Sequence, residues 1–443
     1  MKIYMETMGC PKNFYDTQTA LGILKENDFL ISETADDADV LILNTCGFIN
    51  DAKKESIDRI FELSEYRMSG KKLIVSGCLS ERYHRELMDE MPEVDGFIGV
   101  NEYETLPDII NEMMYSENRF DNVTGCPSKN LGRLPRIIGD NPYTATLKIA
   151  EGCNNRCAYC VIPSIRGPYR SKKKEDIIEE ARWLSEKGCR ELILIAQDVT
   201  YYGTDLYGHM ALPQLLRELC RIDGIRWIRL MYCYDDRITD DLIQVIREEP
   251  KICHYIDIPI QHASDRILRK MNRRSDRKSV ESVIGKLRDA VPDMHIRTTL
   301  ITGFPGETEE DFEELMDFVE SARFARLGVF AYSQEENTPA GQMEDQIPEE
   351  IKASRADAVM RLQMDISLEL NRKKIGQVME VIVDEIDEDG SYIGRTAFDA
   401  PEIDNAVIFT SQRQLSPGDM VYVHIKDAFD YDLTGMEVEN EFA

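Results

Sequence analysis

The first 130 residues alternate short apolar runs with stretches of helical periodicity. Apolar runs that predict strands occupy residues 2–7, 40–46 and 72–78, and a helical pattern follows each of them. Strands that alternate with helices predict a parallel α/β sheet. The carboxyl ends of parallel strands share one edge of a sheet, so cysteines at these strand ends are expected to converge there: Cys10, Cys46 and Cys78.

The strand–helix alternation is stronger from residue 143 to 371, after a segment rich in Pro, Gly and Arg (131–142) that we interpret as a linker. Six βα units are too few for a closed eight-fold barrel, so the pattern predicts an open, partial (βα)6 TIM-like barrel. Its site is expected at the carboxyl ends of the strands. The six strand candidates are residues 143–150, 191–198, 227–234, 255–262, 295–303 and 327–333.

The helical pattern stops near residue 376, and short alternating segments replace it, separated by Asp, Gly and Pro turns. This pattern predicts a small antiparallel β-barrel of five strands over residues 376–443. The expected fold class is therefore a multidomain α/β protein. It comprises an N-terminal parallel α/β domain (1–130), the linker, the partial barrel (143–371) and the C-terminal β-barrel.

Charge and composition narrow the classes of function. The chain has 53 Lys and Arg against 82 Asp and Glu, a net charge of −29, which disfavours bulk binding to nucleic acid. No apolar run reaches the roughly 18 residues of a membrane helix, and the start lacks the apolar core of a secretory signal. We therefore expect a soluble, cytoplasmic protein without membrane contact. Its 11 cysteines should be thiols or metal ligands rather than disulfides.

The most specific motif directly follows the first barrel strand. Cys153, Cys157 and Cys160 have the spacing Cys-x3-Cys-x2-Cys. An iron–sulfur cluster needs four ligands, so this loop leaves one iron free for a small molecule. The alternative is a zinc site, but zinc loops usually add a second Cys or His pair, and none is nearby.

This motif resembles that of the radical S-adenosylmethionine superfamily. The resemblance implies a [4Fe-4S] cluster on Cys153, Cys157 and Cys160, whose free iron chelates the amino and carboxylate groups of S-adenosylmethionine. Reductive cleavage of the sulfonium would release a 5′-deoxyadenosyl radical that removes hydrogen from an unactivated C–H bond. The cofactor would carry the difficult step while the protein positions it, and no side-chain acid or base is assigned.

The strand-end cysteines extend the resemblance to the whole chain. Each of them alone would be interpreted as a buried thiol. As a set, Cys10, Cys46 and Cys78 resemble the auxiliary [4Fe-4S] site of the methylthiotransferase family, whose C-terminal TRAM domain the predicted β-barrel also resembles. The other five cysteines are interpreted as ordinary thiols: Cys126, Cys189, Cys220, Cys233 and Cys253.

By the same resemblance, two strand ends would contact S-adenosylmethionine. Gln197 and Asp198 would meet its methionine end, and Gly303 and Gly306 its adenosyl moiety. An alternative for the second region is that Thr308 and Asp311 cap the next helix. Two inward candidates, Arg297 and Gln261, could hold a carboxylate. The basic runs 170–174 and 269–278 are interpreted as solvated helix faces, and the alternative is that they contact substrate or phosphate.

The C-terminal unit bears on the substrate. Residues 376–443 hold 3 basic and 16 acidic residues, which suits a basic protein better than RNA. Several segments also resemble the family branch that modifies an aspartate of small-subunit ribosomal protein twelve: residues 197–203, 205–208, 257–264, 332–336 and 399–404.

The resemblance implies that a β-C–H of one aspartate in that ribosomal protein is replaced by C–S–CH3. It implies a flavodoxin or ferredoxin as electron donor, and we expect the substrate loop to be clamped between the barrel mouth and the C-terminal unit. Three alternatives stay open. They are the same chemistry on an adenosine of transfer RNA, a non-enzymatic iron–sulfur electron carrier, and a zinc-binding scaffold.

Overall fold

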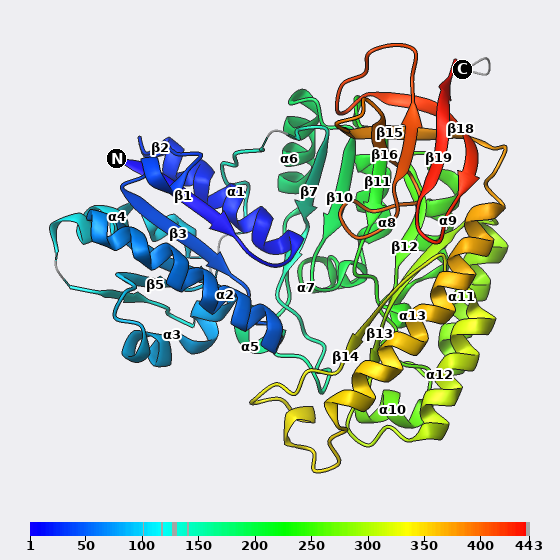
Figure 1. Cartoon of the computed structure of the whole chain (residues 1–443), viewed down its shortest axis with the longest axis horizontal. Helices are drawn as coiled ribbons and strands as arrows, with labels where there is room; N and C mark the ends of the chain where they lie inside the picture. The colour runs from blue at the N-terminus through cyan, green and yellow to red at the C-terminus, as the bar shows by residue number, and fades with distance from the viewer. Residues whose placement is uncertain (101, 117, 126–130, 140, 440–443) are drawn as a thin grey trace.

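A computed structural model describes residues 1–100, 102–116, 118–125, 131–139 and 141–439. Cys126 and part of the linker lie outside the described residues. Figure 1 shows three units: an N-terminal α/β unit, a larger barrel unit of strands and helices, and a small β-barrel at the C-terminus. The expected multidomain α/β fold class is confirmed.

The N-terminal unit is a six-stranded parallel sheet with the strand order β2-β1-β3-β4-β5-β6. The three strands expected from the sequence are β1, β3 and β4, and they lie side by side. The strands are β1 (Lys2–Thr7), β2 (Leu30–Ile31), β3 (Val40–Thr45), β4 (Lys72–Gly77), β5 (Gly96–Ile98) and β6 (Phe120–Asn122). The helices are α1 (Pro11–Glu26), α2 (Asn50–Ser64), α3 (Cys78–Glu90) and α4 (Leu106–Tyr115).

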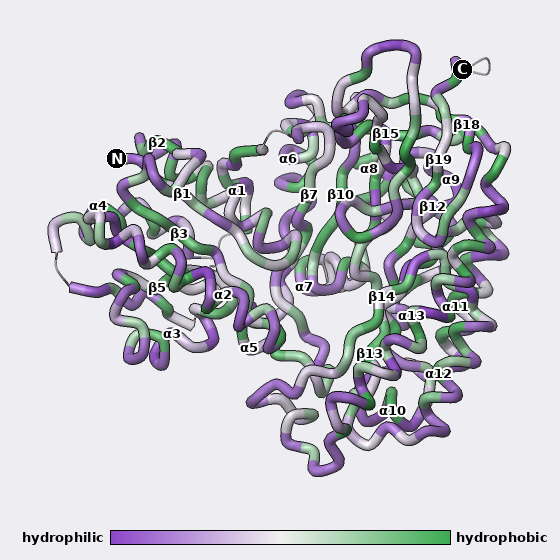
Figure 2. Tube along the Cα trace, in the orientation of Figure 1, coloured by the Kyte–Doolittle hydropathy of each residue, from purple (hydrophilic) through white to green (hydrophobic). Residues whose placement is uncertain are grey.

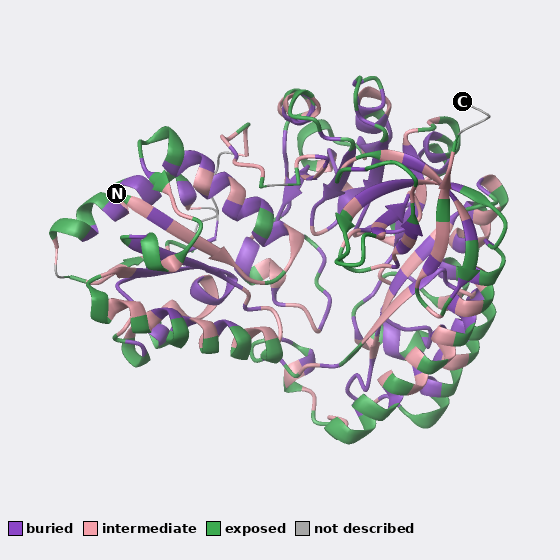
Figure 3. Ribbon diagram, turned by 45° about the horizontal axis from the view of Figure 1, so that its top comes forward, coloured by how far each residue is buried: buried purple, intermediate pink, exposed green. Residues whose placement is uncertain are grey.

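Both faces of this sheet are covered. On one face Val40 and Ile42 pack with α1 and α4, and on the other Leu41 and Leu43 pack with α2 and α3. β3 is buried throughout, which explains its continuous apolar run. In Figure 2 the hydrophobic colour follows the strands, and in Figure 3 the outer helix faces are exposed. The carboxyl edge of the sheet is left for polar and sulfur-containing side chains.

The central unit is a second six-stranded parallel sheet, β14-β13-β12-β11-β10-β7, whose two end strands do not pair with each other. It is the open, partial barrel that the sequence predicts. Its strands are β7 (Thr144–Lys148), β10 (Glu191–Ile195), β11 (Trp227–Leu230), β12 (Ile252–Asp257), β13 (His295–Thr302) and β14 (Arg326–Ala331). A short pair, β8 (Ala150–Glu151) and β9 (Arg170–Ser171), flanks the cysteine loop.

Helices pack around the outside of the barrel. Their apolar faces join those of the strands in one core, which holds Leu192, Leu194 and Ile228 among many others. The helices are α5 (Ile162–Arg166), α6 (Lys174–Glu186), α7 (Thr204–Tyr207), α8 (Leu212–Leu219), α9 (Asp240–Glu248), α10 (Asp265–Lys270), α11 (Arg277–Ala290), α12 (Glu309–Ala322) and α13 (Glu349–Arg372).

The C-terminal unit is a closed five-stranded barrel, as expected. One pair departs from the expected antiparallel arrangement, because β17 and β19 run parallel. The reason is geometric: directions cannot alternate all the way round a closed ring of five strands, so one neighbouring pair must be parallel. The strands are β15 (Val378–Ile386), β16 (Tyr392–Thr396), β17 (Val407–Thr410), β18 (Met420–Ala428) and β19 (Leu433–Val438).

This C-terminal barrel contacts the amino ends of the central strands. Arg395 pairs with Glu191, the first residue of β10, at 2.8 Å. Asp399 accepts from Nε of Arg326, the first residue of β14, at 3.0 Å. The cysteine loop follows the opposite, carboxyl end of β7 (Figure 1). The expectation that the C-terminal unit clamps a substrate against the barrel mouth is therefore wrong, because the unit closes the other end.

Among the helices of the described residues, none combines the length and apolar character that crossing a membrane requires.

Candidate functional site

The three strand-end cysteines come together as the sequence predicts. Cys10 occupies the N-cap position of α1 after β1, Cys46 follows β3, and Cys78 begins α3 after β4. Gly9 has φ +92°, and a Cβ there would lie 2.8 Å from Cβ and 3.1 Å from Sγ of Cys46. A glycine is therefore required for the two strand ends to approach each other. We call Cys10, Cys46 and Cys78 the strand-end triad.

Burial and mutual repulsion disfavour thiolates in this triad. Burial raises the pKa of Cys46 and raises that of Cys78 to about 12, and the neighbouring thiols act in the same direction. Arg166 opposes this effect, because its guanidinium lies 3.6 Å from Cys78 Sγ and favours the thiolate. All three cysteines are free thiols, and Cys10 and Cys46 keep partial exposure.

The second group of cysteines lies on the loop after β8, and we call Cys153, Cys157 and Cys160 the loop triad. The loop begins at Gly152 with φ +77°, where a Cβ would lie 2.2 Å from the Pro168 carbonyl oxygen. The backbone N–H of Asn155 donates to Cys153 Sγ at 3.4 Å. Burial raises the pKa of Cys153 and Cys160. Backbone donors pointing at sulfur are typical of iron–sulfur sites.

A polar network holds the loop triad against the neighbouring strands. Asn155 Nδ2 donates to Asp198 at 3.0 Å, and Arg237 pairs with the same carboxylate while donating to Asn155 Oδ1 at 2.8 Å. Cys157 Sγ lies 3.7 Å from the Tyr234 hydroxyl. The loop is therefore fixed by residues after β10 and β11, before any ligand binds.

Both triads fit an iron–sulfur cluster better than a single ion. In the described parts of the chain, no three His, Cys, Asp or Glu side chains converge closely enough to hold one metal ion. A cluster makes a different demand, since each thiolate binds a different iron atom and three soft sulfur donors suffice when a ligand takes the fourth iron. Bound iron also deprotonates a coordinating thiol, which overcomes the raised pKa values.

A buried ionic network that the sequence pattern did not predict joins the two triads. Arg166, at 1% exposure, contacts Asp16 of α1 at 3.0 Å and Glu151, two residues before Cys153, at 3.1 Å. Lys148 of β7 pairs with the same two carboxylates, at 2.5 Å and 2.8 Å. These cations hold the pKa of Glu151 well below its usual range in spite of burial. The network ties the N-terminal unit to the barrel between the triads.

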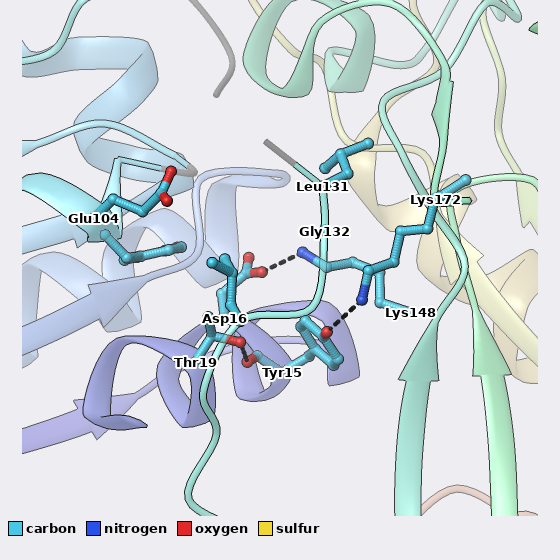
Figure 4. A pocket seen from close by; sticks show the side chains of 11 residues that line it. Tyr15, Asp16, Thr19, Glu104, Leu131, Gly132, Lys148 and Lys172 are labelled. Atoms are coloured by element: carbon cyan, nitrogen blue, oxygen red, sulfur yellow. Dashed lines mark hydrogen bonds and ion pairs between the residues drawn. The ribbon is translucent and has the colours of Figure 1, made fainter. Parts of the chain in front are cut away.

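A second network lies beside it, centred on Glu180 of α6. Tyr15 of α1 donates to Glu180, and Lys172 pairs with Glu180 at 2.7 Å. Lys172 also donates to the Tyr15 hydroxyl at 2.9 Å, a contact drawn in Figure 4. Arg136 of the predicted linker also pairs with Glu180, at 2.5 Å. Lys172 is therefore buried, and the interpretation of run 170–174 as a solvated face is wrong at this position.

The two residues predicted to bind the methionine end of S-adenosylmethionine differ in whether they have a hydrogen-bonding atom left unused. Gln197 Nε2 donates to Glu151 at 2.9 Å, whereas its buried Oε1 has no hydrogen-bond partner among the described residues. This acceptor is free to bind a donor such as an ammonium group, and the contact of Gln197 with the methionine end stays a prediction. Asp198 is buried, which raises its pKa, and its oxygens are taken up by Asn155, Arg237 and Thr200.

The other residues predicted to contact S-adenosylmethionine or a carboxylate lie against side chains and backbone of the protein itself. Arg297 Nη1 pairs with Asp257 at 3.0 Å and its Nε lies 3.4 Å from Asp404 of the C-terminal unit. A Cβ at Gly303 would meet Lys352, and one at Gly306 would meet Asp345 and Lys270. Gln261 has φ +73° and contacts the Pro259 carbonyl at 3.5 Å. The capping box of Thr308 and Asp311 is confirmed at the start of α12.

Lys12 is a further residue that the sequence pattern did not single out. It lies on the first turn of α1, two residues after Cys10, and is 8% exposed. Its ammonium lies 3.2 Å from the ring centroid of Tyr232, at the carboxyl end of β11. Burial lowers the pKa of Lys12. The sequence feature that could have indicated Lys12 is its position two residues after Cys10.

A cavity of about 300 Å³ opens beside the loop triad. Cys157 and Tyr234 line it together with Arg273, whose guanidinium lies 4.5 Å from the Tyr234 ring centroid. Arg156 and Arg274 are exposed at its rim. The run 269–278 thus contributes one buried cation and one rim cation rather than only a solvated face.

Three family models match the chain. The Radical SAM superfamily matches residues 147–319, the TRAM domain matches residues 375–438, and a family described only as Uncharacterized protein family UPF0004 matches residues 2–99.

Curated relatives match over nearly the whole length. Ribosomal protein uS12 methylthiotransferase RimO of Desulforamulus reducens is 50% identical, over 97% of this chain and 98% of the relative. The protein of the same name from Clostridioides difficile is 48% identical over 98% of both chains.

Solved structures share the fold. The radical S-adenosylmethionine methyltransferase TsrM from Kitasatospora setae, with cobalamin and a [4Fe-4S] cluster bound, has a TM-score of 0.58. It is 12% identical, covering 86% of this chain and 80% of that one. The cobalamin-dependent radical enzyme OxsB has a TM-score of 0.53 at 12% identity, covering 90% of this chain and 64% of that one.

Proposed function

The chain belongs to the family of ribosomal protein uS12 methylthiotransferases, and from this premise we propose that it adds a methylthio group to the β-carbon of an aspartate of uS12. It is a transferase of the radical S-adenosylmethionine type. The modification replaces one C–H bond of the substrate side chain by C–S–CH3.

The enzyme uses S-adenosylmethionine and two [4Fe-4S] clusters. We assign one cluster to the loop triad and the auxiliary cluster to the strand-end triad, with Gln197 accepting a hydrogen bond from the amino group of S-adenosylmethionine. When bound, these groups supply a carbon-centred radical and the sulfur that is transferred. The corresponding domains are residues 1–130, 143–371 and 376–443.

The observation that carries this proposal is the arrangement of two thiol triads around one buried ionic network. Arg166 reaches Cys78 Sγ at one end and the Glu151 carboxylate at the other. Each triad keeps a different set of supporting residues, so each can hold its own group. Because α1 and β7 are ion-paired, the distance between the triads is fixed and a substrate carbon can be held between them.

Transfer RNA is the second candidate substrate, and the charge distribution argues against it. The acidic C-terminal barrel disfavours a phosphate backbone. Because the barrel lies at the amino ends of the central strands, its charge opposes the long-range attraction of RNA to the chain rather than contacts at the triads. The carboxyl ends of the strands remain the side from which a substrate approaches.

For reduction we propose a flavodoxin or ferredoxin with an acidic surface. Arg156 and Arg274 are exposed cations on a strongly acidic chain, and they lie beside Cys157. Replacing both by Glu should slow turnover at least about tenfold with the protein donor, because like charges oppose docking, and leave turnover with dithionite unchanged. Equal rates with the protein donor would contradict this docking site.

The function is tested by anaerobic reconstitution with iron, sulfide, S-adenosylmethionine and a reductant. The probes are a synthetic uS12 peptide containing the aspartate and, in parallel, transfer RNA. Mass spectrometry should show one methylthio unit on the peptide aspartate and none on the RNA. Modification of the RNA alone would overturn the substrate, and a chain with neither cluster would overturn the activity.

A further inference from the structure

A buried lysine without a protein counter-ion lies beside the strand-end triad. Lys12 follows Cys10 by two residues and is 8% exposed. The described residues give it no ion pair and no hydrogen bond, and its ammonium rests on the Tyr232 ring at 3.2 Å. A buried cation is costly unless an anion or a polar partner accompanies it, and a ring face replaces only part of that interaction.

The neighbouring carboxylates already have other partners. The Cys10 sulfur, two residues away and assigned to the auxiliary cluster, is the first of the negative groups whose charge acts on Lys12, and the carboxylates that act on it are Glu151 and Asp257. Glu151 accepts from Lys148 and Arg166, while Asp257 accepts from Arg297 at 3.0 Å and from the Tyr232 backbone N–H at 3.0 Å. Neither carboxylate is therefore available as the partner of Lys12.

Backbone hydrogen bonds fix the position of Tyr232, whose ring contacts the Lys12 ammonium. Tyr232 has φ +58°, which is uncommon for a residue with a side chain and is held here from both sides. Its N–H donates to Asp257, and its carbonyl accepts from the Val199 N–H at 3.1 Å. Tyr232, Cys10 and Cys46 all keep partial exposure, so a ligand can reach this point.

We propose that Lys12 binds the side-chain carboxylate of the substrate aspartate and thereby places its β-carbon next to the strand-end triad. The inference rests on the proposed function, because it requires an acidic side chain as the reacting group. One carboxylate would supply the anion that Lys12 lacks, and the first turn of α1 adds a favourable dipole. Lys12 would thus select aspartate over an uncharged side chain.

The test compares two peptides that differ in one charge. The uS12 peptide with its aspartate and the same peptide with asparagine are bound to anaerobic holoenzyme, and each Kd is measured by fluorescence anisotropy of the labelled peptide. The wild-type chain should prefer the aspartate peptide by about tenfold or more, as expected for a desolvated charge pair. Lys12→Met should lose that preference by weakening the aspartate peptide alone, and Lys12→Arg should retain most of it.

Controls separate the other roles that Lys12 could have. Lys25→Met removes an exposed lysine at the far end of the same helix and should change neither Kd. The iron content of Lys12→Met should match that of the wild type, and its midpoint potential is measured in parallel.

Three outcomes would overturn the inference. A retained preference in Lys12→Met excludes a role in carboxylate binding. A changed cluster potential with unchanged preference assigns Lys12 to the cluster, and a rise in the Kd of S-adenosylmethionine without peptide assigns it to that cofactor. If the wild type modifies neither peptide, the proposed function is wrong and the inference falls with it.

Discussion

Each of the two cysteine triads brings three thiol groups together, but the backbone achieves this differently in the two cases. The loop triad lies within one loop of eight residues, Cys153 to Cys160, whereas the strand-end triad joins positions as distant as Cys10 and Cys78. Local spacing defines the first, and the order of adjacent parallel strands defines the second. The difference teaches that the loop triad depends on its own backbone, while the strand-end triad depends on the integrity of a whole sheet.

The largest difference is expected from removing one cysteine of each triad. Cys157→Ala should abolish formation of 5′-deoxyadenosine, because the loop cluster loses a ligand. Cys46→Ala should leave that cleavage at least partly intact and stop sulfur transfer. Chromatography of the nucleoside and mass spectrometry of the peptide measure both. Equal loss of cleavage in the two variants would contradict the proposal that the triads have different roles.

Removing Arg166 tests whether the two triads are mechanically joined. Arg166→Met leaves Lys148 as the remaining cation on two buried carboxylates, so one buried negative charge loses its partner and the free energy of unfolding should fall by about 3–5 kcal/mol. The matched control is Arg133→Met, whose exposed pair with Glu179 should contribute about 0–1 kcal/mol. Urea unfolding of the anaerobic apoprotein compares them, and similar values would refute the joint role.

Low pH should weaken the junction between the N-terminal unit and the barrel, because it protonates Glu180. Burial alone would raise the pKa of its carboxyl, but Lys172 and Arg136 lower it from 4.5 to about 2. The folded chain thus prefers the ionised form, so this contribution is complete above pH 4.5 and is lost as the pH falls towards 2, with a total of about 3 kcal/mol. Glu180→Gln should flatten the stability profile over this range; an unchanged slope would contradict the pairing.

Two glycine variants should show whether the two clusters assemble independently, with a smaller loss of stability. Gly9→Ala forces a Cβ against Cys46, and Gly152→Ala forces one against the Pro168 carbonyl, with strain of about 1–3 kcal/mol each. Each variant should lower the occupancy of its own cluster and spare the other. Iron content and the spectra of the two clusters decide this. Loss of both clusters in either variant would show that they do not assemble independently.

The smallest effect is expected at the segment after β13. Thr308→Ala removes the N-cap of α12 and should cost about 1 kcal/mol of stability without changing the Kd of S-adenosylmethionine. Thermal unfolding and equilibrium binding measure the two quantities. A weaker cofactor Kd would instead favour the predicted contact of Gly303 and Gly306 with the adenosyl moiety.

Periodicity and strand ends were enough to predict most elements and both triads. The strand β1 has the predicted bounds, and β3 and β4 each stop one residue short of the expected run. The sequence did not reveal Lys12, Arg166 or the Glu180 network. Their partners are distant in the chain, as in the pair of Arg166 with Asp16, so no local pattern records them. The place of the C-terminal barrel was missed for the same reason.

The amino ends of the central strands are sealed by the C-terminal barrel through Arg395, Asp399 and Asp404. This seal limits how the protein can be recombined. Grafting the C-terminal domain of another enzyme onto residues 1–375 would leave Glu191, Arg326 and Arg297 facing foreign side chains. A chimera meant to redirect the enzyme to another macromolecule therefore has to transplant these three contacts along with the new domain.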